Sequence, residues 1–326
     1  MSSIIVSRRF LAALAVTLTL LLAPLAQAAE KIVAGTVGSA SALLWAHIIA
    51  AQKGFFTAED IDFEMQYIPA SAAVIQQLTG GSLNMAVGTG LVDPIRAIDK
   101  GSPALIVRIE GQTPPYVLMA KPSITALKDL KGKVISLGGA KDITRIYVER
   151  MLAPNGVQPG EFDMVFAGAT SARFAALESG AVDAAIVTAP FNFRAEAEGF
   201  RNLGMVVDYV KDLPFSAIVV DAGWGASHKP LVQRFLAAYT KSIAWFYDDN
   251  NRDEAIAILI NATNADTKDI ALSYDFFRKI DFFEPTGKVS RTRLGNVMKV
   301  LQQFGDVDPA LAVDRLVMPG VTEMTD

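Results

Sequence analysis

The chain has 326 residues, a formal net charge of −4, two histidines and no cysteine. Nucleic acids and anionic membrane surfaces require clustered Lys and Arg, which this acidic balance does not favour, so we predict no nucleic-acid partner. Because histidine is scarce and cysteine absent, we predict neither a metal site nor a cofactor. The length allows one large domain or two lobes.

The N-terminus has the pattern of a cleavable secretory signal peptide spanning residues 1–28. Arg8 and Arg9 precede a short apolar run, and Ala26-Gln27-Ala28 supplies the small residues of a cleavage site. An uncleaved membrane anchor is the alternative, although the apolar run is short for a bilayer span. We therefore expect a protein exported to the periplasm, by the general secretory or the twin-arginine route.

The mature chain then alternates strands with helices. Residues 31–37 predict a strand, and an apolar helix around Trp45 follows a short loop. Residues 61–67 alternate apolar and polar side chains, which is typical of a half-buried strand. Ser71 is placed to cap the next helix, and residues 83–87 predict another strand. This alternation predicts an α/β architecture.

An internal similarity links two distant parts of the chain. Residues 78–87 and 177–186 each read as a helix end, a glycine turn and a strand that begins with an Asn or Asp. In the same register, Thr89 falls opposite Thr188. The spacing is too long for a solenoid, so we predict two similar α/β lobes, each with its own sheet. Chance recurrence of a common strand-turn pattern is the alternative.

Two extended crossings between the lobes predict a two-stranded hinge, at residues 104–120 and 215–220. We therefore divide the mature chain into a discontinuous first lobe, residues 29–113 plus 217–326, and a second lobe, residues 114–216. The C-terminal part of the first lobe reads as several amphipathic helices.

Catalytic chemistry has little support in the sequence. His47 lies within an apolar helix and His228 precedes a proline by two positions, and isolated histidines of this kind are usually packing or surface residues. No H-E-x-x-H, Walker A or G-x-S-x-G motif is present, and no base is evident that would activate a Ser or Thr nucleophile. We predict that the protein is not an enzyme.

Several stretches of the chain, in order, resemble one family. They are Ala51-Gln52-Lys53-Gly54-Phe55-Phe56, residues 88–103, residues 127–134, and residues 176–184, followed by Ala189-Pro190-Phe191. They are similar to the periplasmic substrate-binding proteins of nitrate, sulfonate and taurine transporters, the NMT1/THI5-like family. The resemblance implies an α/β, two-lobed type II periplasmic-binding-protein fold with a central ligand cleft and a two-stranded hinge. It also implies a small-molecule ligand and, as partners, an ABC permease and ATPase. We expect a monomer.

Ligand-binding residues are expected at the strand-to-helix turns, because helix N-termini offer free N–H groups and the carboxyl ends of strands border the cleft. The candidates on these turns are Ser39, Ser41, Ser71, Thr89, Gly90 and Thr188. Aromatic walls are expected from Trp45, Phe191 and Phe215, and the hinge crossing adds Gln112. For the serines a plain helix cap is the alternative, and for the aromatic residues a place in the core.

The turn that opens the first helix of the second lobe carries Asp142, Thr144 and Arg145. Family members commonly place Ser and Thr here, so this departure leaves the ligand open. Arg145 could form a bidentate pair with a carboxylate or sulfonate. The alternative is that Arg145 is solvated or paired with Asp142. Asp142 is alternatively a helix cap. Thr188 and Ala189 stand where the family often has Trp and an acid, which disfavours a zwitterion and favours a plain anion or a neutral ring.

The main functional hypothesis is a periplasmic solute-binding component of an ABC importer, which captures a small organic anion such as a sulfonate or carboxylate by lobe closure. Two alternatives stay open. One is a THI5-like enzyme of pyrimidine synthesis, which the leader and the scarce histidine oppose. The other is a sensory domain that presents its ligand to a receptor.

Overall fold

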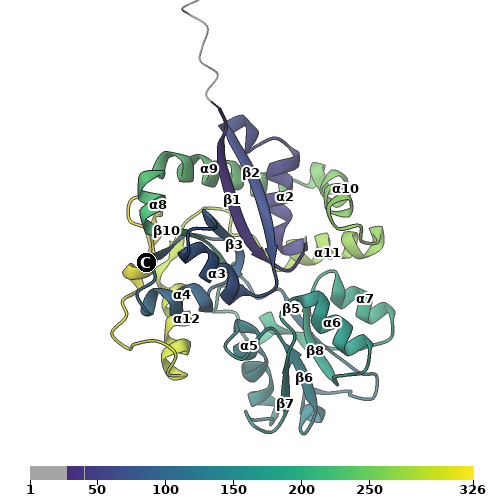
Figure 1. Cartoon of the computed structure of the whole chain (residues 1–326). Helices are drawn as coiled ribbons and strands as arrows, with labels where there is room; N and C mark the ends of the chain where they lie inside the picture. Colours follow the sequence, from purple (N-terminus) through teal and green to yellow (C-terminus); the bar gives the residue numbers. More distant parts are fainter. Residues whose placement is uncertain (1–27, 40) are drawn as a thin grey trace, which may run out of the picture.

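The computed structural model describes residues 28–39 and 41–326 (Figure 1). The predicted signal peptide lies outside these residues except for its last position. Within the described ranges, no helix is both long enough and apolar enough to cross a bilayer. Two five-stranded sheets, one above the other in Figure 1, divide the molecule into two lobes. The predicted two-lobed α/β fold is therefore confirmed.

The first lobe is built on a sheet with the strand order β2-β1-β3-β10-β4. Its strands are β1 (Glu30–Val37), β2 (Ile61–Ile68), β3 (Met85–Gly90), β4 (Ala104–Ile109) and β10 (Ser216–Asp221). Strands β1, β2 and β3 run parallel, whereas β10 pairs antiparallel with both β3 and β4. The central strand β3 is buried along its whole length, as expected for a strand of an α/β sheet that is covered on both faces.

The second lobe repeats this arrangement with the strand order β7-β6-β8-β5-β9. Its strands are β5 (Tyr116–Ala120), β6 (Val134–Leu137), β7 (Asp163–Phe166), β8 (Ala184–Thr188) and β9 (Arg201–Met205). Strands β6, β7 and β8 run parallel, and β5 pairs antiparallel with β8 and β9. Order and direction therefore match those of the first sheet, strand for strand.

The recurrent Asn or Asp has the same task in each lobe. Asn84 accepts the N–H of Val33 at 2.8 Å, and Asp183 accepts the N–H of Val134 at 3.0 Å. In return, the backbone N–H groups of Asn84 and Asp183 donate to the carbonyls of Val33 and Val134. Each side chain thus satisfies a backbone donor beside a central strand. The internal similarity in the sequence is structural, and not a chance recurrence.

Helices follow most strands and cover the sheets. They are α2 (Trp45–Gln52), α3 (Ser71–Thr79) and α4 (Val92–Asp99) in the first lobe, and α5 (Ile143–Leu152), α6 (Thr170–Glu178) and α7 (Phe191–Ala197) in the second. The predicted capping role of Ser71 is wrong, because Ala70 holds the N-cap position and Ser71 is the first helical residue. Asp142 does cap α5, since its side chain accepts the N–H of Thr144.

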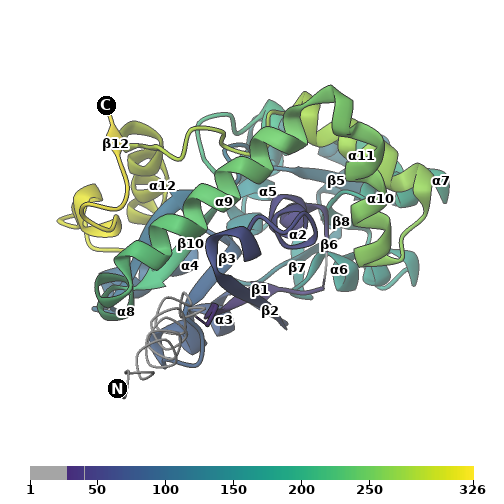
Figure 2. The same cartoon turned by 90° about the horizontal axis from the view of Figure 1, so that it is seen from above.

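The C-terminal part of the chain returns to the first lobe. It contains α8 (Ala222–Ser227), α9 (Lys229–Tyr247), α10 (Arg252–Thr263), α11 (Thr267–Lys279), α12 (Arg291–Gln303) and the short strands β11 (Val289–Ser290) and β12 (Met324–Thr325). Seen from above, α9 runs across the lobe from α8 to the end where α10 and α11 lie (Figure 2), and it packs against α2. The helical tail predicted from the sequence is confirmed.

Two segments cross between the lobes and are hydrogen-bonded to each other. Residues 110–115 join β4 to β5, and residues 206–215 join β9 to β10. The N–H of Phe215 donates to the carbonyl of Gly111 at 2.8 Å, and the N–H of Gly111 donates to the hydroxyl of Ser216 at 3.1 Å. The predicted lobe boundaries fall beside these crossings and stay a prediction.

Gly111 leaves no room for a side chain at the crossing. A Cβ there would lie 2.6 Å from Cζ of Phe282, whose ring is only 1% exposed and cannot move without displacing its neighbours. We expect Gly111→Ala to lower the free energy of unfolding by about 1–3 kcal/mol, measured by urea denaturation. Gly295→Ala in α12 is the control, because its new Cβ would make only an ordinary 3.6 Å contact. Equal stability of wild type and Gly111→Ala would contradict this account.

Candidate functional site

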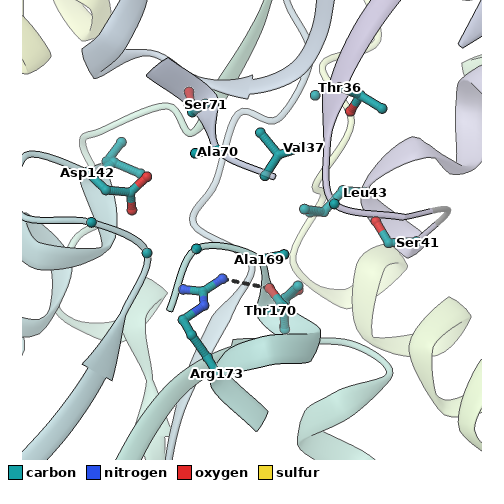
Figure 3. Close-up of a pocket in the computed structure, with 18 of the residues that line it drawn as sticks. Thr36, Val37, Ser41, Leu43, Ala70, Ser71, Asp142, Ala169, Thr170 and Arg173 are labelled. Carbon is teal, nitrogen blue, oxygen red and sulfur yellow. Dashed lines mark hydrogen bonds between the residues drawn. The ribbon is translucent and has the colours of Figure 1, made fainter. Parts of the chain in front are cut away.

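A cavity of about 240 Å³ lies between the two lobes. Its walls come from the turns after β1, β3, β6, β7 and β8, together with the start of α3. Figure 3 shows Val37 and Ser71 of the first lobe facing Thr170 and Arg173 of the second lobe across an open space. The cavity therefore lies at the carboxyl ends of strands of both sheets, where α/β proteins bind ligands.

The structure brings together most of the residues that the sequence analysis proposed. Those that line the cavity are Ser39, Ser41, Ser71, Gly90, Asp142, Thr188, Phe191 and Phe215. The hydroxyl of Thr188 is buried and has no hydrogen-bond partner within the described part of the chain, and the buried hydroxyl of Ser71 interacts with Asp93. The contact of either hydroxyl with a ligand stays a prediction.

Two of the proposed threonines are buried beside the cavity without lining it. Thr89 lies between the lining residues Gly88 and Gly90, and the alternation of a strand directs its side chain to the other face of the sheet. Thr144 supports the turn before α5: its hydroxyl donates to Asp142 at 2.5 Å and accepts the N–H of Gly138 at 2.9 Å. Thr144 therefore shapes the turn that carries Asp142.

Three further proposed residues lie away from the cavity. Trp45 is fully buried in the first lobe, where its indole N–H donates to the carbonyl of Ala255 at 2.8 Å and its ring packs against Phe246. The side chain of Gln112 donates to a backbone carbonyl at the hinge, at 2.7 Å. Arg145 forms an ion pair with Glu149, one helical turn away, at 2.8 Å. Its charge is therefore already neutralised and is not available to an anionic ligand.

Arg173, on the first turns of α6, is the cavity residue that the sequence analysis missed. Its side chain is 3% exposed, and its guanidinium points into the cavity (Figure 3). One N–H donates to the hydroxyl of Thr170 at 2.6 Å, and the group lies 5.3 Å from the ring centre of Tyr116. Among the described residues, its Nε and Nη1 meet no partner with hydrogen-bond geometry, the Tyr116 hydroxyl is close enough to interact with the guanidinium, and no carboxylate lies within 4.0 Å. A guanidinium is always charged, so the cavity wall contains a buried cation without a carboxylate partner among the described residues.

Two carboxylates line the same cavity from opposite lobes. Asp142 caps α5, and Asp93 lies on the first turn of α4 with its side chain 15% exposed. Burial raises the pKa of Asp93 to about 6, and the charge of Asp142 acts in the same direction, whereas Ser71 and Arg96 oppose the shift. Arg96 approaches Asp93 only to 3.7 Å.

Contacts in two places join the lobes beside the cavity residues Lys141 and Phe191. On one side, Arg96 donates to Asp306 at 2.5 Å and to the backbone carbonyl of Lys141, and the Lys141 ammonium lies 3.2 Å from Asp306. Arg96 and Asp306 belong to the first lobe, whereas Lys141 belongs to the second. Elsewhere between the lobes, Phe193 of α7 meets Phe276 of α11 edge-on at 6.0 Å. These contacts connect the two lobes.

The buried His47 lies behind the cavity wall and does not line the cavity. His47 Nε2 lies 2.5 Å from Glu110, and the other oxygen of Glu110 accepts the N–H of the lining residue Gly88 at 2.6 Å. His228 stacks on Trp224 at the far end of the first lobe. Over the described ranges, no three His, Asp or Glu side chains gather in a way that would hold a metal ion.

Comparison with known proteins agrees with this geometry. A model of the family described as NMT1/THI5 like matches residues 45–252, more than half of the chain. None of the curated proteins matches the chain. Three solved structures illustrate the shared fold. The alkanesulfonate-binding protein SsuA from Xanthomonas axonopodis pv. citri, bound to MOPS, is 16% identical with a TM-score of 0.71, and the match covers 92% of this chain and 100% of that one.

The periplasmic nitrate-binding protein NrtA from Synechocystis PCC 6803 is also 16% identical, with a TM-score of 0.70, and the match covers 89% of this chain and 86% of that one. The third is a mutant of DszB, an enzyme, in complex with biphenyl-2-sulfinic acid. It is 14% identical with a TM-score of 0.66, and the match covers 90% of this chain and 97% of that one. At these identities the likeness shows the fold alone, and the chemistry has to come from the cavity residues.

The raised pKa of Asp93 predicts a pH-dependent effect of its removal. Between about pH 4 and pH 6 the folded protein binds a proton at Asp93 that the unfolded chain releases, so the stability contributed by this group falls as pH rises through that window. A shift of about two units corresponds to at most about 3 kcal/mol. We expect Asp93→Asn to be about 1–3 kcal/mol more stable than wild type at about pH 8 and equal to it at about pH 4.

Urea denaturation at the two pH values measures this difference. Asp253→Asn is the control, because the Asp253 side chain is 99% exposed. A stability gain of Asp93→Asn that is the same at both pH values would contradict the assignment.

Proposed function

Because the chain belongs to the NMT1/THI5-like family, we propose that it is the periplasmic solute-binding component of an ABC importer and captures a small organic anion by closing its lobes. It shares its fold with alkanesulfonate- and nitrate-binding proteins. The predicted signal peptide supports export to the periplasm, and an ABC permease and its ATPase would be the partners.

The observation that supports an anionic ligand is the buried guanidinium of Arg173, which has no carboxylate partner among the described residues. A buried charge without a partner destabilises a protein, because the water that it loses on burial is not replaced. Two of its nitrogen atoms, Nε and Nη1, lack a partner with hydrogen-bond geometry among the described residues, so each can donate to an oxygen of an anionic ligand. An anionic ligand would complete this site, and the free hydroxyl of Thr188 lines the same cavity.

The arrangement of the lobes supports capture by closure. Cavity residues come from both sheets, and the two sheets are joined by the paired crossings at Gly111 and Phe215. A ligand that contacts both lobes favours the closed form by the difference between its affinities for the two forms. The change of shape, and not a chemical step, would then be the signal that the importer reads.

Binding of an anion predicts a rise in melting temperature. A ligand at a hundred times its Kd stabilises the folded protein by about 2.7 kcal/mol. We expect at least one member of a panel of small alkanesulfonates, aromatic sulfonates and carboxylates to raise the melting temperature of the mature protein. Arg173→Gln should weaken that ligand at least about tenfold, or about 1.4 kcal/mol, in isothermal titration calorimetry.

The same variant should raise the melting temperature of the empty protein, because it removes an unpaired buried charge. A general loss of folding would instead lower the stability and the affinity together. Arg201→Gln, on an exposed position of β9, is the matched control. The proposal fails if no anion of the panel binds, or if Arg173→Gln binds the anion as tightly as wild type.

A further inference from the structure

The charges inside the cavity do not match a site for a simple anion. Four charged residues line it, namely Arg173, Lys141, Asp93 and Asp142. The side chain of Lys141 is 72% exposed, and its ammonium is turned to Asp306 on the rim. The interior therefore holds one guanidinium and two carboxylates, and a plain anion bound at Arg173 would share the cavity with two charges of its own sign.

Neither carboxylate is neutralised by a close basic side chain. Asp142 has no Lys, Arg or His within 4.0 Å among the residues that the structure covers, and the N-cap bond occupies only one of its oxygens. The one cation near Asp93 is Arg96, at 3.7 Å, and Arg96 donates instead to Asp306 at 2.5 Å. Both carboxylates thus lack a close cationic partner and can accept a hydrogen bond from a ligand.

A buried hydroxyl lies beside Asp93 in the cavity wall. The Ser71 side chain is 8% exposed and lines the cavity. Its hydroxyl interacts with Asp93 and opposes the rise in the pKa of that carboxyl, although their geometry falls short of a full hydrogen bond. A polar part of a ligand that reaches Asp93 would therefore also meet the oxygen of Ser71.

We propose that the ligand is amphoteric, with an acidic group bound by Arg173 and a protonated amine held between Asp93 and Asp142. An ammonium group has three donors and no acceptor, which suits two carboxylates and the hydroxyl of Ser71. The inference rests on the proposed function, because it assumes that an organic anion occupies Arg173. The side chains of Leu43, Phe191 and Phe215 also line the cavity and offer apolar surface to the carbon skeleton between the two charged groups.

This arrangement would also couple the amine to closure. Asp93 belongs to the first lobe and Asp142 to the second, so closing the empty protein brings two like charges together, which is unfavourable. An ammonium between them turns this repulsion into two attractions that span the lobes.

The pH dependence of binding distinguishes a ligand that carries an amine from a plain anion. Asp93 is faced by Arg96 on its own helix, by Ser71 of α3 and by Asp142 of the second lobe, and its pKa is raised to about 6. If the ligand carries an amine, its affinity rises with pH through this range, because Asp93 becomes charged. If the ligand is a plain anion, its affinity falls over the same range, because Asp93 begins to repel it.

The experiment uses matched pairs of acids that differ only in an amine. Suitable pairs are 2-aminoethanesulfonate with ethanesulfonate, 4-aminobutanoate with butanoate, and 4-(aminomethyl)benzoate with 4-methylbenzoate. Their affinities for the mature protein are measured by isothermal titration calorimetry at about pH 5 and about pH 8. We expect the amine-bearing member of at least one pair to bind about tenfold more tightly at about pH 8, and this advantage to shrink at about pH 5.

Asp93→Asn and Asp142→Asn test the assigned residues. Asparagine keeps the shape of both side chains and remains a good N-cap at position 142, so both variants should fold. Each should remove most of the advantage of the amine at about pH 8, while the exposed control Asp253→Asn should keep it. Equal or tighter binding of the amine-free acids, or an unchanged preference in both variants, would overturn this inference and leave the proposed function standing. If no acid of either kind binds, the proposed function fails, and this inference fails with it.

Discussion

The arrangement of the molecule depends on the pairing of two crossing segments. Hydrogen bonds between Gly111 and the Phe215–Ser216 segment tie one crossing to the other, so the two sheets are joined by a double strand of backbone. Glu110, at the start of the first crossing, is bonded to His47 and to the backbone of Gly88 in β3. The buried carboxylate thus anchors the hinge to a strand whose end lines the cavity. Movement of one lobe relative to the other has to bend these segments, because no other stretch of the described chain passes between the sheets.

The frame of the cavity could be predicted from the sequence, because strand and helix periodicity and the repeated Asn or Asp are local signals. Residues 78–87 and 177–186 do build equivalent strands, and Thr188 lies at the carboxyl end of the second one, where it lines the cavity. Contacts between side chains that are distant in sequence were not predictable. Trp45 occupies a helix that opens near the cleft, yet its ring is turned into the core, and helical spacing alone does not distinguish these directions.

Arg173 is a second residue whose surroundings could not be predicted from the sequence. Arg173 follows a strand and opens a helix much as Arg145 does, but an arginine in a sequence carries no sign of burial or of missing partners. Only the packing of α6 under the cavity shows that its charge is uncompensated, whereas Arg145 found a partner one helical turn away. The buried guanidinium and the two carboxylates therefore define the chemistry of a site whose outline alone was accessible from the sequence.

The contacts between the lobes beside the cavity oppose its opening. Arg96, Asp306 and Lys141 join the lobes at one place, and Phe193 with Phe276 joins them at another, so separating the lobes has to break both. Because Lys141 is largely exposed, added salt screens its attraction to Asp306 and favours opening, whereas the aromatic contact is insensitive to salt. Since Lys141 also lines the cavity, this salt dependence would act on both the rate of exchange and the affinity of a bound molecule.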